Sequence, residues 1–378
     1  MKTIGIIAEY NPFHLGHLYQ IDKIKELYPN STIIAIISTC FTERGDISII
    51  NKWDKAKICL TYGIDLVVEF PTLYATQSAD TFAYAGLKIL NELKIDTLVF
   101  GSESADIDLL TLLAKTEINN PRYDNLVKKY LNEGVNYPTA KSKALYELTN
   151  IKIDKPNDLL GLSYIKEIIA NNYHITPILI KRTNDYHSKE IKSNIINASL
   201  IRELLKNNKN ISNYLPNEVN KYINKDANIE NIYTYLKYNI ILNKDNLSNY
   251  LLVDEGIENR ILNALKKSNN YQELIMNIKT KRYTYNKISR MLLHILLGTK
   301  KEDNYKDIYL RILGFNHKGR THLNKIKKDI TIPIFTSYRN NQIKSLDIEY
   351  KSTYIYSIIT NNSDLIDEEY HNKPIIFK

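Results

Sequence analysis

The sequence lacks most of the features that would place a protein outside the cell or in a membrane. It has two cysteines, Cys40 and Cys59, and neither lies in a Cys-x-x-Cys pair or a Cys/His cluster. We therefore expect no disulfide framework, no structural zinc and no other bound structural metal. No apolar run is long enough to span a bilayer, and the N-terminus has no small-residue cleavage pattern. These absences predict a cytoplasmic protein without a membrane segment.

The charge is distributed unevenly along the 378 residues. Residues 1–203 carry 23 Lys and Arg against 24 Asp and Glu, whereas residues 204–378 carry 28 against 18. Within the second half, residues 260–328 hold 17 basic and 4 acidic side chains, with tyrosines among them. This mixture suits a polyanion with exposed bases, such as RNA. A solvated basic surface accounts for it equally well.

Five β-branched apolar runs follow one another in the first half, separated by amphipathic segments. They lie at residues 3–9, 32–38, 65–70, 96–101 and 176–182. Such a pattern predicts strands buried on both faces, and hence an α/β fold with a Rossmann-like, doubly wound parallel sheet covered by helices. Ligands of this architecture bind beyond the carboxyl ends of the strands, at the switch in strand order.

The alternation stops after about residue 203. Leu, Ile and Tyr then recur at helical spacing through residues 229–300, with short extended pieces such as residues 330–338. We predict a catalytic domain over residues 1–205 and a mostly helical, basic domain over residues 206–378.

A His-x-Gly-His sequence directly follows the first predicted strand, with His14, Gly16 and His17 in its fixed positions. Glycine lets the backbone approach a phosphate, and the amides at the start of the next helix favour an anion. Two imidazoles there can stabilise charge in a displacement at the α-phosphate of a nucleotide. His14 and His17 are thus the catalytic candidates. A zinc site is not predicted because no third ligand has suitable spacing. Alternatively, both histidines only cap and pack the helix.

With its surroundings, this motif resembles the bacterial tRNA(Met) cytidine acetate ligases, a branch of the HxGH nucleotidyltransferase superfamily. The resemblance extends over nearly the whole chain. It rests on GIIAEYNPFHLGH (5–17), RGD-x-x-x-x-NKW (44–53), DLVVEFPTLYATQSADTFA (65–83), FGSE (100–103), KPNDLLGLSYIKEI (155–168), KRTNDYH (181–187), TKRYTYNKISRMLLHILLG (280–298) and LGFNHKGRTHL (313–323).

The resemblance implies a two-step reaction. Acetate attacks the α-phosphate of Mg²⁺-bound ATP to give acetyl-adenylate, and N4 of the wobble cytidine of elongator tRNA(Met) takes the acetyl group, forming N4-acetylcytidine. It also implies that one segment binds ATP: Ile7, Ala8, Glu9, Tyr10, Asn11, Pro12, Phe13, His14, Leu15, Gly16, His17, Leu18, Tyr19 and Gln20. Gly101, Asn157 and Arg182 would join it. The alternatives for these three are a turn glycine, a helix N-cap and a surface ion pair.

Two further segments are compared with the family. Ser199 and Arg202 match a Ser/Thr-x-Ile-Arg turn that meets the β- and γ-phosphates, although the family's usual first serine is Asn197 here; an N-cap with one exposed arginine is the alternative. Thr39-Cys40 stands where the family has Gly-Asn, which puts acceptor specificity in question. Arg44, Asp46, Asn51 and Lys52 follow this loop as further candidates for the cleft, unless a helix capped near Asn51 accounts for them.

Docking of a tRNA anticodon arm needs basic side chains in the second half. We predict that Tyr283 or Tyr285 stacks on a base and that five cations bind tRNA phosphates: Lys279, Lys281, Arg282, Lys287 and Arg290. These cations equally fit the solvated face of a helix. The expected partners are tRNA(Met), acetate and ATP, with no obligate protein partner. A small-molecule adenylyltransferase and a catalytically inactive tRNA-binding protein remain alternative functions.

Overall fold

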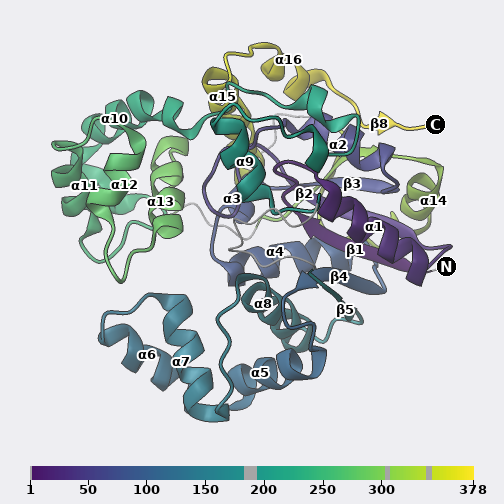
Figure 1. The fold of residues 1–378 in the computed structure, drawn as a ribbon, viewed down its shortest axis with the longest axis horizontal. Helices are drawn as coiled ribbons and strands as arrows, with labels where there is room; N and C mark the ends of the chain where they lie inside the picture. Colours follow the sequence, from purple (N-terminus) through teal and green to yellow (C-terminus); the bar gives the residue numbers. More distant parts are fainter. Residues whose placement is uncertain (1, 183–193, 303–306, 338–342) are drawn as a thin grey trace.

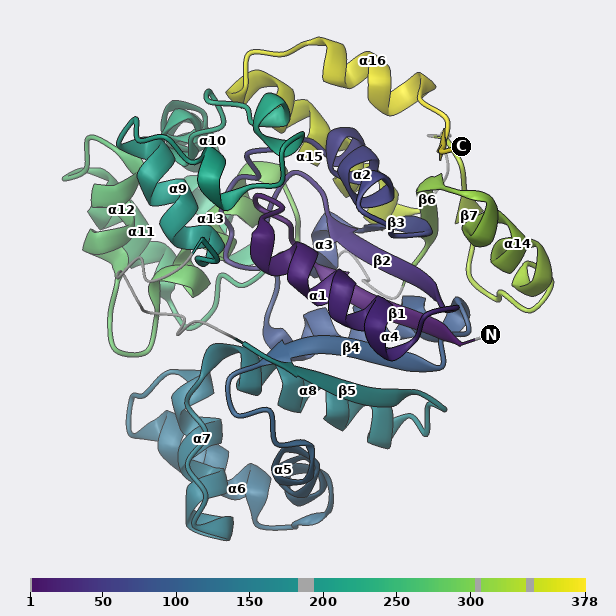
Figure 2. The ribbon, with the colours of Figure 1, turned by 45° about the vertical axis from the view of Figure 1, so that its right-hand side comes forward.

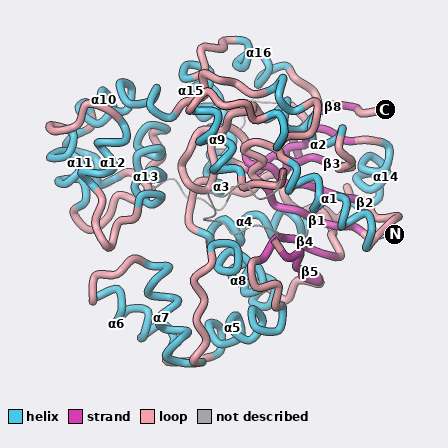
Figure 3. The backbone as a smooth tube through the Cα atoms, viewed as in Figure 1, coloured by secondary structure: helices cyan, strands magenta, loops and turns pink. Residues whose placement is uncertain are grey.

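A sheet of eight strands forms the centre of the computed structural model, which describes residues 2–182, 194–302, 307–337 and 343–378. The strand order is β5-β4-β1-β2-β3-β6-β7, and β8 pairs with β6. Figure 3 shows the strands gathered together, with helices around them. The strands are β1 (Thr3–Ala8), β2 (Thr32–Ser38), β3 (Leu66–Phe70), β4 (Thr97–Ser102), β5 (Thr176–Lys181), β6 (Leu310–Phe315), β7 (Ile334–Phe335) and β8 (Ile375–Ile376).

The predicted α/β fold is confirmed, and each of the five predicted strands is present to within a residue or two. β1 to β5 run parallel, and every residue of β2 is buried, because helices cover both faces of the sheet. β1 lies between β2 and β4, so the strand order changes direction there. The carboxyl ends of β1 and β4 therefore flank the position where this architecture binds ligands.

The helices of the first half cover the sheet and extend below it (Figures 1 and 2). α1 and α2 pack on one face, and α4 and α8 on the other, as right-handed crossovers require. Helices α5 to α7 form a group at the bottom of Figure 1, where α5 packs against α8. Their bounds are α1 (Leu15–Leu27), α2 (Lys52–Thr61), α3 (Thr72–Ala75), α4 (Ala79–Glu92), α5 (Ile107–Asn119), α6 (Tyr123–Asn132), α7 (Tyr137–Thr149) and α8 (Pro156–Ala170).

The second half is mostly helical, as predicted, but it also contributes to the sheet. β6 pairs antiparallel with β3, and β7 lies within the predicted extended piece at residues 330–338. The division at residue 205 stays a prediction, and the sheet crosses it. The α-helices are α9 (Ala198–Lys206), α10 (Tyr233–Leu242), α11 (Ile257–Leu265), α12 (Tyr271–Ile278), α13 (Tyr285–Leu297), α14 (His317–Ile326), α15 (Lys344–Ile359) and α16 (Asp364–His371). The 3₁₀-helices are η1 (Ser212–Tyr214), η2 (Val219–Tyr222), η3 (Ile229–Ile232) and η4 (Lys244–Asn249).

These later helices occupy different sides of the molecule (Figure 1). α10 to α13 form a lobe at the left of the view, whereas α14 lies at the right, beyond the sheet. α15 packs against both α3 and α13 and so connects the lobe to the sheet. None of the helices described is long and apolar enough to cross a membrane.

A buried ion cluster joins the two halves of the chain. The Lys52 Nζ atom lies 2.8 Å from Glu69, 3.1 Å from Glu349 and 2.6 Å from Glu369. Arg311 of β6 pairs with Glu69 at 3.5 Å and also with Glu369. All five side chains are buried. Burial alone would lower the pKa of Lys52, but the three carboxylates raise it, so the ammonium keeps its charge.

We predict that Lys52→Met lowers the free energy of unfolding by about 3–5 kcal/mol, because it leaves the buried Glu349 without a cation and leaves Glu69 and Glu369 with Arg311 alone. Urea unfolding of wild type and variant measures this change. The matched control is Lys57→Met, an exposed lysine on the same helix, whose effect should stay within about 0.5 kcal/mol. Equal unfolding midpoints for the two variants would show that the cluster does not stabilise the fold.

Candidate active site

The His-x-Gly-His sequence forms the start of α1, directly beyond the carboxyl end of β1. His14 is the N-cap residue, and its Nδ1 atom accepts a hydrogen bond from the Gly16 amide at 3.0 Å. The Nδ1 atom of His17 accepts one from the His14 amide at 3.2 Å. Each neutral ring therefore carries its proton on Nε2 and can donate it to a ligand. The two ring centroids are 3.8 Å apart.

Gly16 is required here by the space around His14. A Cβ atom at this position would lie 2.7 Å from Cε1 of the His14 ring, closer than real Cβ contacts allow. We predicted glycine here because it lets the backbone approach a phosphate. The structure adds a second reason, which is that a side chain at position 16 would collide with the His14 ring. The capping role proposed as an alternative for the two histidines is also present, and it is compatible with donation from Nε2.

Both rings are kept neutral by their surroundings. Burial lowers the pKa of His14 to about 3, and the nearby Arg182 and Arg202 guanidinium groups add to this effect. Burial, His14 and Arg182 hold the pKa of His17 well below its usual range. The two histidines therefore act as neutral hydrogen-bond donors in the unliganded protein, and the arginines supply the positive charge.

The predicted phosphate-binding turn lies at the start of α9. Asn197 is the N-cap residue and accepts a hydrogen bond from the Leu200 amide at 2.8 Å, a role that asparagine and serine can both fill. Arg202 donates to the Asn11 carbonyl at 2.7 Å and lies 3.6 Å from an Asp46 oxygen. The alternative interpretation expected an exposed arginine, but Arg202 is only partly exposed. Its two contacts connect the loops that follow β1 and β2.

Asn157 lies beside the segment that follows β4, and Arg182 directly follows β5. Asn157 belongs to the first turn of α8, whose N-cap is Lys155, so the N-cap alternative for Asn157 is wrong. Its side-chain amide donates to Glu103 at 2.6 Å. Arg182 is half-buried, and its Nε atom has no hydrogen-bond partner among the described residues. Gly101 lies beside it: a Cβ atom there would be 3.4 Å from Cγ of Arg182.

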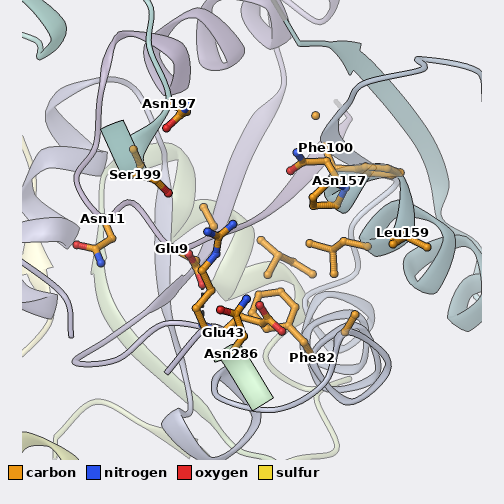
Figure 4. A pocket seen from close by; sticks show the side chains of 18 of the residues that line it. Glu9, Asn11, Glu43, Phe82, Phe100, Asn157, Leu159, Asn197, Ser199 and Asn286 are labelled. Carbon is orange, nitrogen blue, oxygen red and sulfur yellow. Dashed lines mark hydrogen bonds between the residues drawn. The ribbon is translucent and has the colours of Figure 1, made fainter. Parts of the chain in front are cut away.

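A cleft of about 750 Å³ brings these residues together. Figure 4 shows Asn197 and Ser199 on one side, Phe100 and Asn157 on another, and Glu43 beside Asn286 on a third. Most of the predicted nucleotide-binding residues line it: Ile7, Ala8, Glu9, Tyr10, Asn11, His14, Gly16, His17, Tyr19, Gln20, Gly101, Asn157, Arg182, Ser199 and Arg202. Pro12, Phe13, Leu15 and Leu18 do not line it, and the buried Phe13 ring stacks on Tyr62 instead.

The first turns of six helices contribute to the wall of this cleft: α1, α4, α7, α8, α9 and α13. Backbone amides at helix N-termini lack intrahelical acceptors, and the helix dipole places partial positive charge there. Their convergence makes the cleft favourable for an anionic ligand, in addition to the charges of Arg182 and Arg202.

Comparison with known proteins agrees with this geometry. The model of the HIGH Nucleotidyl Transferase family matches residues 1–370. The tRNA(Met) cytidine acetate ligase of Clostridium novyi is 37% identical, and the match covers 100% of both chains. That of Bacillus subtilis is 34% identical over 99% of this chain and 97% of the relative. The chain belongs to the tRNA(Met) cytidine acetate ligase family.

Solved structures of one family member have the same fold. The apo crystal structure of Thermotoga maritima TmcAL superposes with a TM-score of 0.91 at 27% identity, and it covers 100% of both chains. A second crystal structure of that protein, bound with alpha-thio ATP, has a TM-score of 0.89 at 28% identity and the same coverage.

The departure from the family pattern at Thr39-Cys40 faces the protein core. Both residues are buried and neither lines the cleft. Thr39 shares a hydrogen bond with Thr72 at 3.0 Å, and the Cys40 sulfur lies 3.8 Å from the Thr353 hydroxyl of α15. Thr39 and Cys40 therefore cannot contact an acceptor in the cleft directly.

Of the four residues that follow, Arg44 lines the cleft, and Asp46 pairs with Arg202 outside its wall. Asn51 caps α2, as the alternative interpretation stated. Lys52 belongs to the buried ion cluster and not to the cleft.

The five cations predicted to bind tRNA do not form one row on a helix. Lys279 and Lys281 are exposed and precede α13. Arg282 pairs with Glu255, Arg290 pairs with Glu43, and the Lys287 Nζ atom lies 4.1 Å from the centroid of the Tyr283 ring. Their role in RNA binding stays a prediction.

The two predicted stacking tyrosines differ in exposure. Tyr283 is buried and donates from its hydroxyl to the Asp254 carbonyl, so its ring is not accessible to a base and Tyr285 stays the candidate of the two. Tyr285 is partly buried and donates to Gln272 at 2.9 Å. The basic stretch at 260–328 is itself divided, because α14 and the α10–α13 lobe lie on opposite sides of the sheet (Figure 1). Of the resemblance motifs, residues 183–187 lie outside the described residues.

Lys55 is a functional candidate that the sequence did not indicate. It is buried, and its ammonium donates to the carbonyls of Glu9, Ser38 and Thr39 at 2.9, 2.8 and 3.2 Å. Burial lowers its pKa to about 8. These bonds hold the ends of β1 and β2 together beneath the cleft. The only sequence signal is a lysine in the apolar face of an amphipathic helix.

The lowered pKa of His14 predicts a loss of stability in acid. Because the unfolded histidine has a pKa near 6.5, the unfolded state binds a proton that the folded state excludes between about pH 6.5 and 3, and the free energy of unfolding falls as pH falls through this range. The contribution of His14 is about 1–2 kcal/mol between pH 7 and 5. Urea unfolding at both pH values, without nucleotide, measures the loss.

The variant His14→Asn keeps an acceptor at the helix N-cap but removes the titrating ring. Its free energy of unfolding should therefore fall less between pH 7 and 5 than that of the wild type. Identical losses in the two proteins would mean that the folded state accommodates a protonated His14.

Proposed function

We propose that the protein is an ATP-dependent ligase that activates acetate and transfers the acetyl group to N4 of the wobble cytidine of elongator tRNA(Met). The observation that carries this proposal is the pair of neutral histidines at the switch point of the sheet, with Nε2 available to a phosphate. The match to tRNA(Met) cytidine acetate ligases over essentially their full length supports the choice of substrates. The alpha-thio ATP bound to a family member supports the nucleotide.

In the first step, a carboxylate oxygen of acetate attacks the α-phosphorus of ATP. The new phosphorus–oxygen bond gives acetyl-adenylate, and the bond to the β-phosphate oxygen breaks, so that pyrophosphate leaves with the electron pair. His14 and His17 donate from Nε2 to phosphate oxygens whose charge grows in the transition state. Ser199 and Arg202, at the start of α9, hold the departing β- and γ-phosphates.

Mg²⁺ accompanies ATP in this proposal and would neutralise part of the triphosphate charge. It prefers oxygen ligands and keeps several waters, so the phosphate oxygens of ATP and water would supply most of its ligands. The described residues include no group of three or more His, Cys, Asp or Glu that could hold a metal without the nucleotide.

In the second step, the N4 amine of cytidine attacks the acetyl carbon. The carbon–nitrogen bond forms, AMP leaves with the electrons of the carbon–oxygen bond, and the amine loses one proton. Gly101, Asn157 and Arg182 stay on the nucleotide through both steps and keep the acyl group in place for the incoming base.

The test is mass spectrometry of an elongator tRNA(Met) transcript incubated with the protein, ATP, Mg²⁺ and isotope-labelled acetate. We expect a labelled acetyl group on the wobble cytidine that requires both ATP and acetate. His17→Ala should slow its formation by at least about a hundredfold, because a donor to the transition state is lost. His371→Ala, at an exposed histidine of α16, is the matched control and should react as the wild type does.

Other outcomes have distinct meanings. Pyrophosphate release that requires acetate, with no acetyl group on the tRNA, would contradict the proposed acceptor and leave the activation step. Adenylylation of a nucleotide-type small molecule would favour the alternative adenylyltransferase. Acetylation from acetyl-CoA without ATP would overturn the proposed mechanism.

A further inference from the structure

The cleft has an end that the nucleotide-binding residues do not use. Its wall is formed by the first turns of α4, α7 and α13, and it includes Asp80, Tyr137, Arg282 and Asn286. In Figure 4, Asn286 lies beside Glu43 and Phe82, on a different side of the cleft from Asn197 and Ser199. This end belongs to the same cavity as the reacting groups, so a second reactant can enter there.

Tyr137 gives this end an open aromatic ring. The residue is 45% exposed and lines the cleft, and the Lys141 Nζ atom lies 5.7 Å from the centroid of its ring. Its hydroxyl donates to Asp80 at 3.3 Å, and Asp80 is itself fixed by Lys141 at 3.1 Å. A tethered ring with free surface is a suitable platform for stacking a nucleic-acid base.

Asn286 gives the same end an amide without an internal partner. It is the second residue of α13, it lines the cleft, and its side chain makes no hydrogen bond within the described part of the chain. A side-chain amide offers both donor and acceptor atoms. The edge of cytosine carries an amino donor next to ring-nitrogen and carbonyl acceptors, so the two groups are complementary.

Contacts between the α5–α7 group and the α10–α13 lobe bring these residues together. The Asn136 side chain reaches the Lys281 carbonyl at 3.5 Å, and Arg282 reaches the Leu131 carbonyl at 3.5 Å. Arg290 of α13 also donates to the Gln77 carbonyl, just before α4, at 3.0 Å. The starts of α4, α7 and α13 are thereby connected around one opening, next to the exposed Lys281.

We propose that this end of the cleft receives the acceptor pyrimidine base of the RNA, with Tyr137 stacked on the base and Asn286 hydrogen-bonded to its edge. This inference rests on the proposed function and adds the binding site of the second substrate. It also explains the open Tyr137 ring, for which the nucleotide-binding end has no use.

The kinetic test compares Tyr137→Leu with Tyr146→Leu. Tyr146 lies on the same helix and is 52% exposed, but it does not line the cleft. Stacking on one base corresponds to roughly a tenfold change in binding. We expect Tyr137→Leu to raise KM for tRNA acetylation about tenfold more than it affects acetate-dependent exchange of pyrophosphate into ATP. Tyr137→Phe, which keeps the ring, should restore most of the loss, and Tyr146→Leu should match the wild type.

A geometric test uses a tRNA(Met) transcript with 5-iodocytidine at the acceptor position. Light joins this base to an aromatic ring stacked on it, and mass spectrometry of the digested complex identifies the residue. We expect the cross-link at Tyr137, a much lower yield in Tyr137→Leu, and a lower yield in Asn286→Ala. A cross-link at another residue, or Tyr137→Leu kinetics equal to those of Tyr146→Leu, would overturn the inference.

Failure of this inference and failure of the proposed function give different results. Cross-linking needs no turnover, so a cross-link at Tyr137 in a protein that transfers no acetyl group would sustain the base site and contradict the ligase. Acetylation by a protein that forms no cross-link at Tyr137 would sustain the ligase and contradict the base site.

Discussion

The buried ion cluster around Lys52 fixes the position of the second half of the chain relative to the first. The cluster consists of two cations and three carboxylates that are buried from solvent. They come from α2, β3, β6, α15 and α16. Removing charges from water is costly, so the cluster is favourable only while every partner is in place. Its geometry therefore specifies how the later segments pack on the sheet and, through α15, where α13 lies.

The same helix, α2, also organises the active site. Lys52 and Lys55 lie one turn apart on its buried side, and Lys55 donates to three carbonyls at the ends of β1 and β2. Loops after parallel strands have few backbone partners of their own. A single ammonium supplies donors to three of their carbonyls at once, which gives the loop after β1 a defined position before any ligand is bound.

Local sequence signals predicted the parts of the structure that depend on local chemistry. The β-branched runs predicted all five parallel strands, and the His-x-Gly-His sequence lies at the switch point because only a short loop separates β1 from α1. β6 was missed because its sequence contains Arg311 and Gly314, which are unfavourable in a buried strand unless a distant carboxylate pairs with the arginine. That partner, Glu369, is remote in sequence, and no local pattern indicates it.

The candidate site was predicted in the same uneven way. Residues near His14 in sequence could be named, as could isolated positions that the resemblance supplied. Sequence reasoning could not name Tyr137, Asn286 or Lys55. Their roles depend on contacts between segments that are far apart in sequence. Charge counts could not locate a single basic surface for a related reason. Residues 260–328 are continuous in the chain, but the fold buries Arg311 and places α14 across the sheet from α13.

The six helix starts around the cleft bear on the order of events in the proposed reaction. Such a wall attracts every polyanion, and both ATP and RNA are polyanions. Loss of pyrophosphate removes most of the negative charge of the nucleotide and leaves a mixed anhydride whose phosphate keeps a single negative charge. The partial positive charge of the helix N-termini is then no longer neutralised by a triphosphate. The attraction of the wall for an RNA backbone is therefore greatest when the acetyl group is ready for transfer.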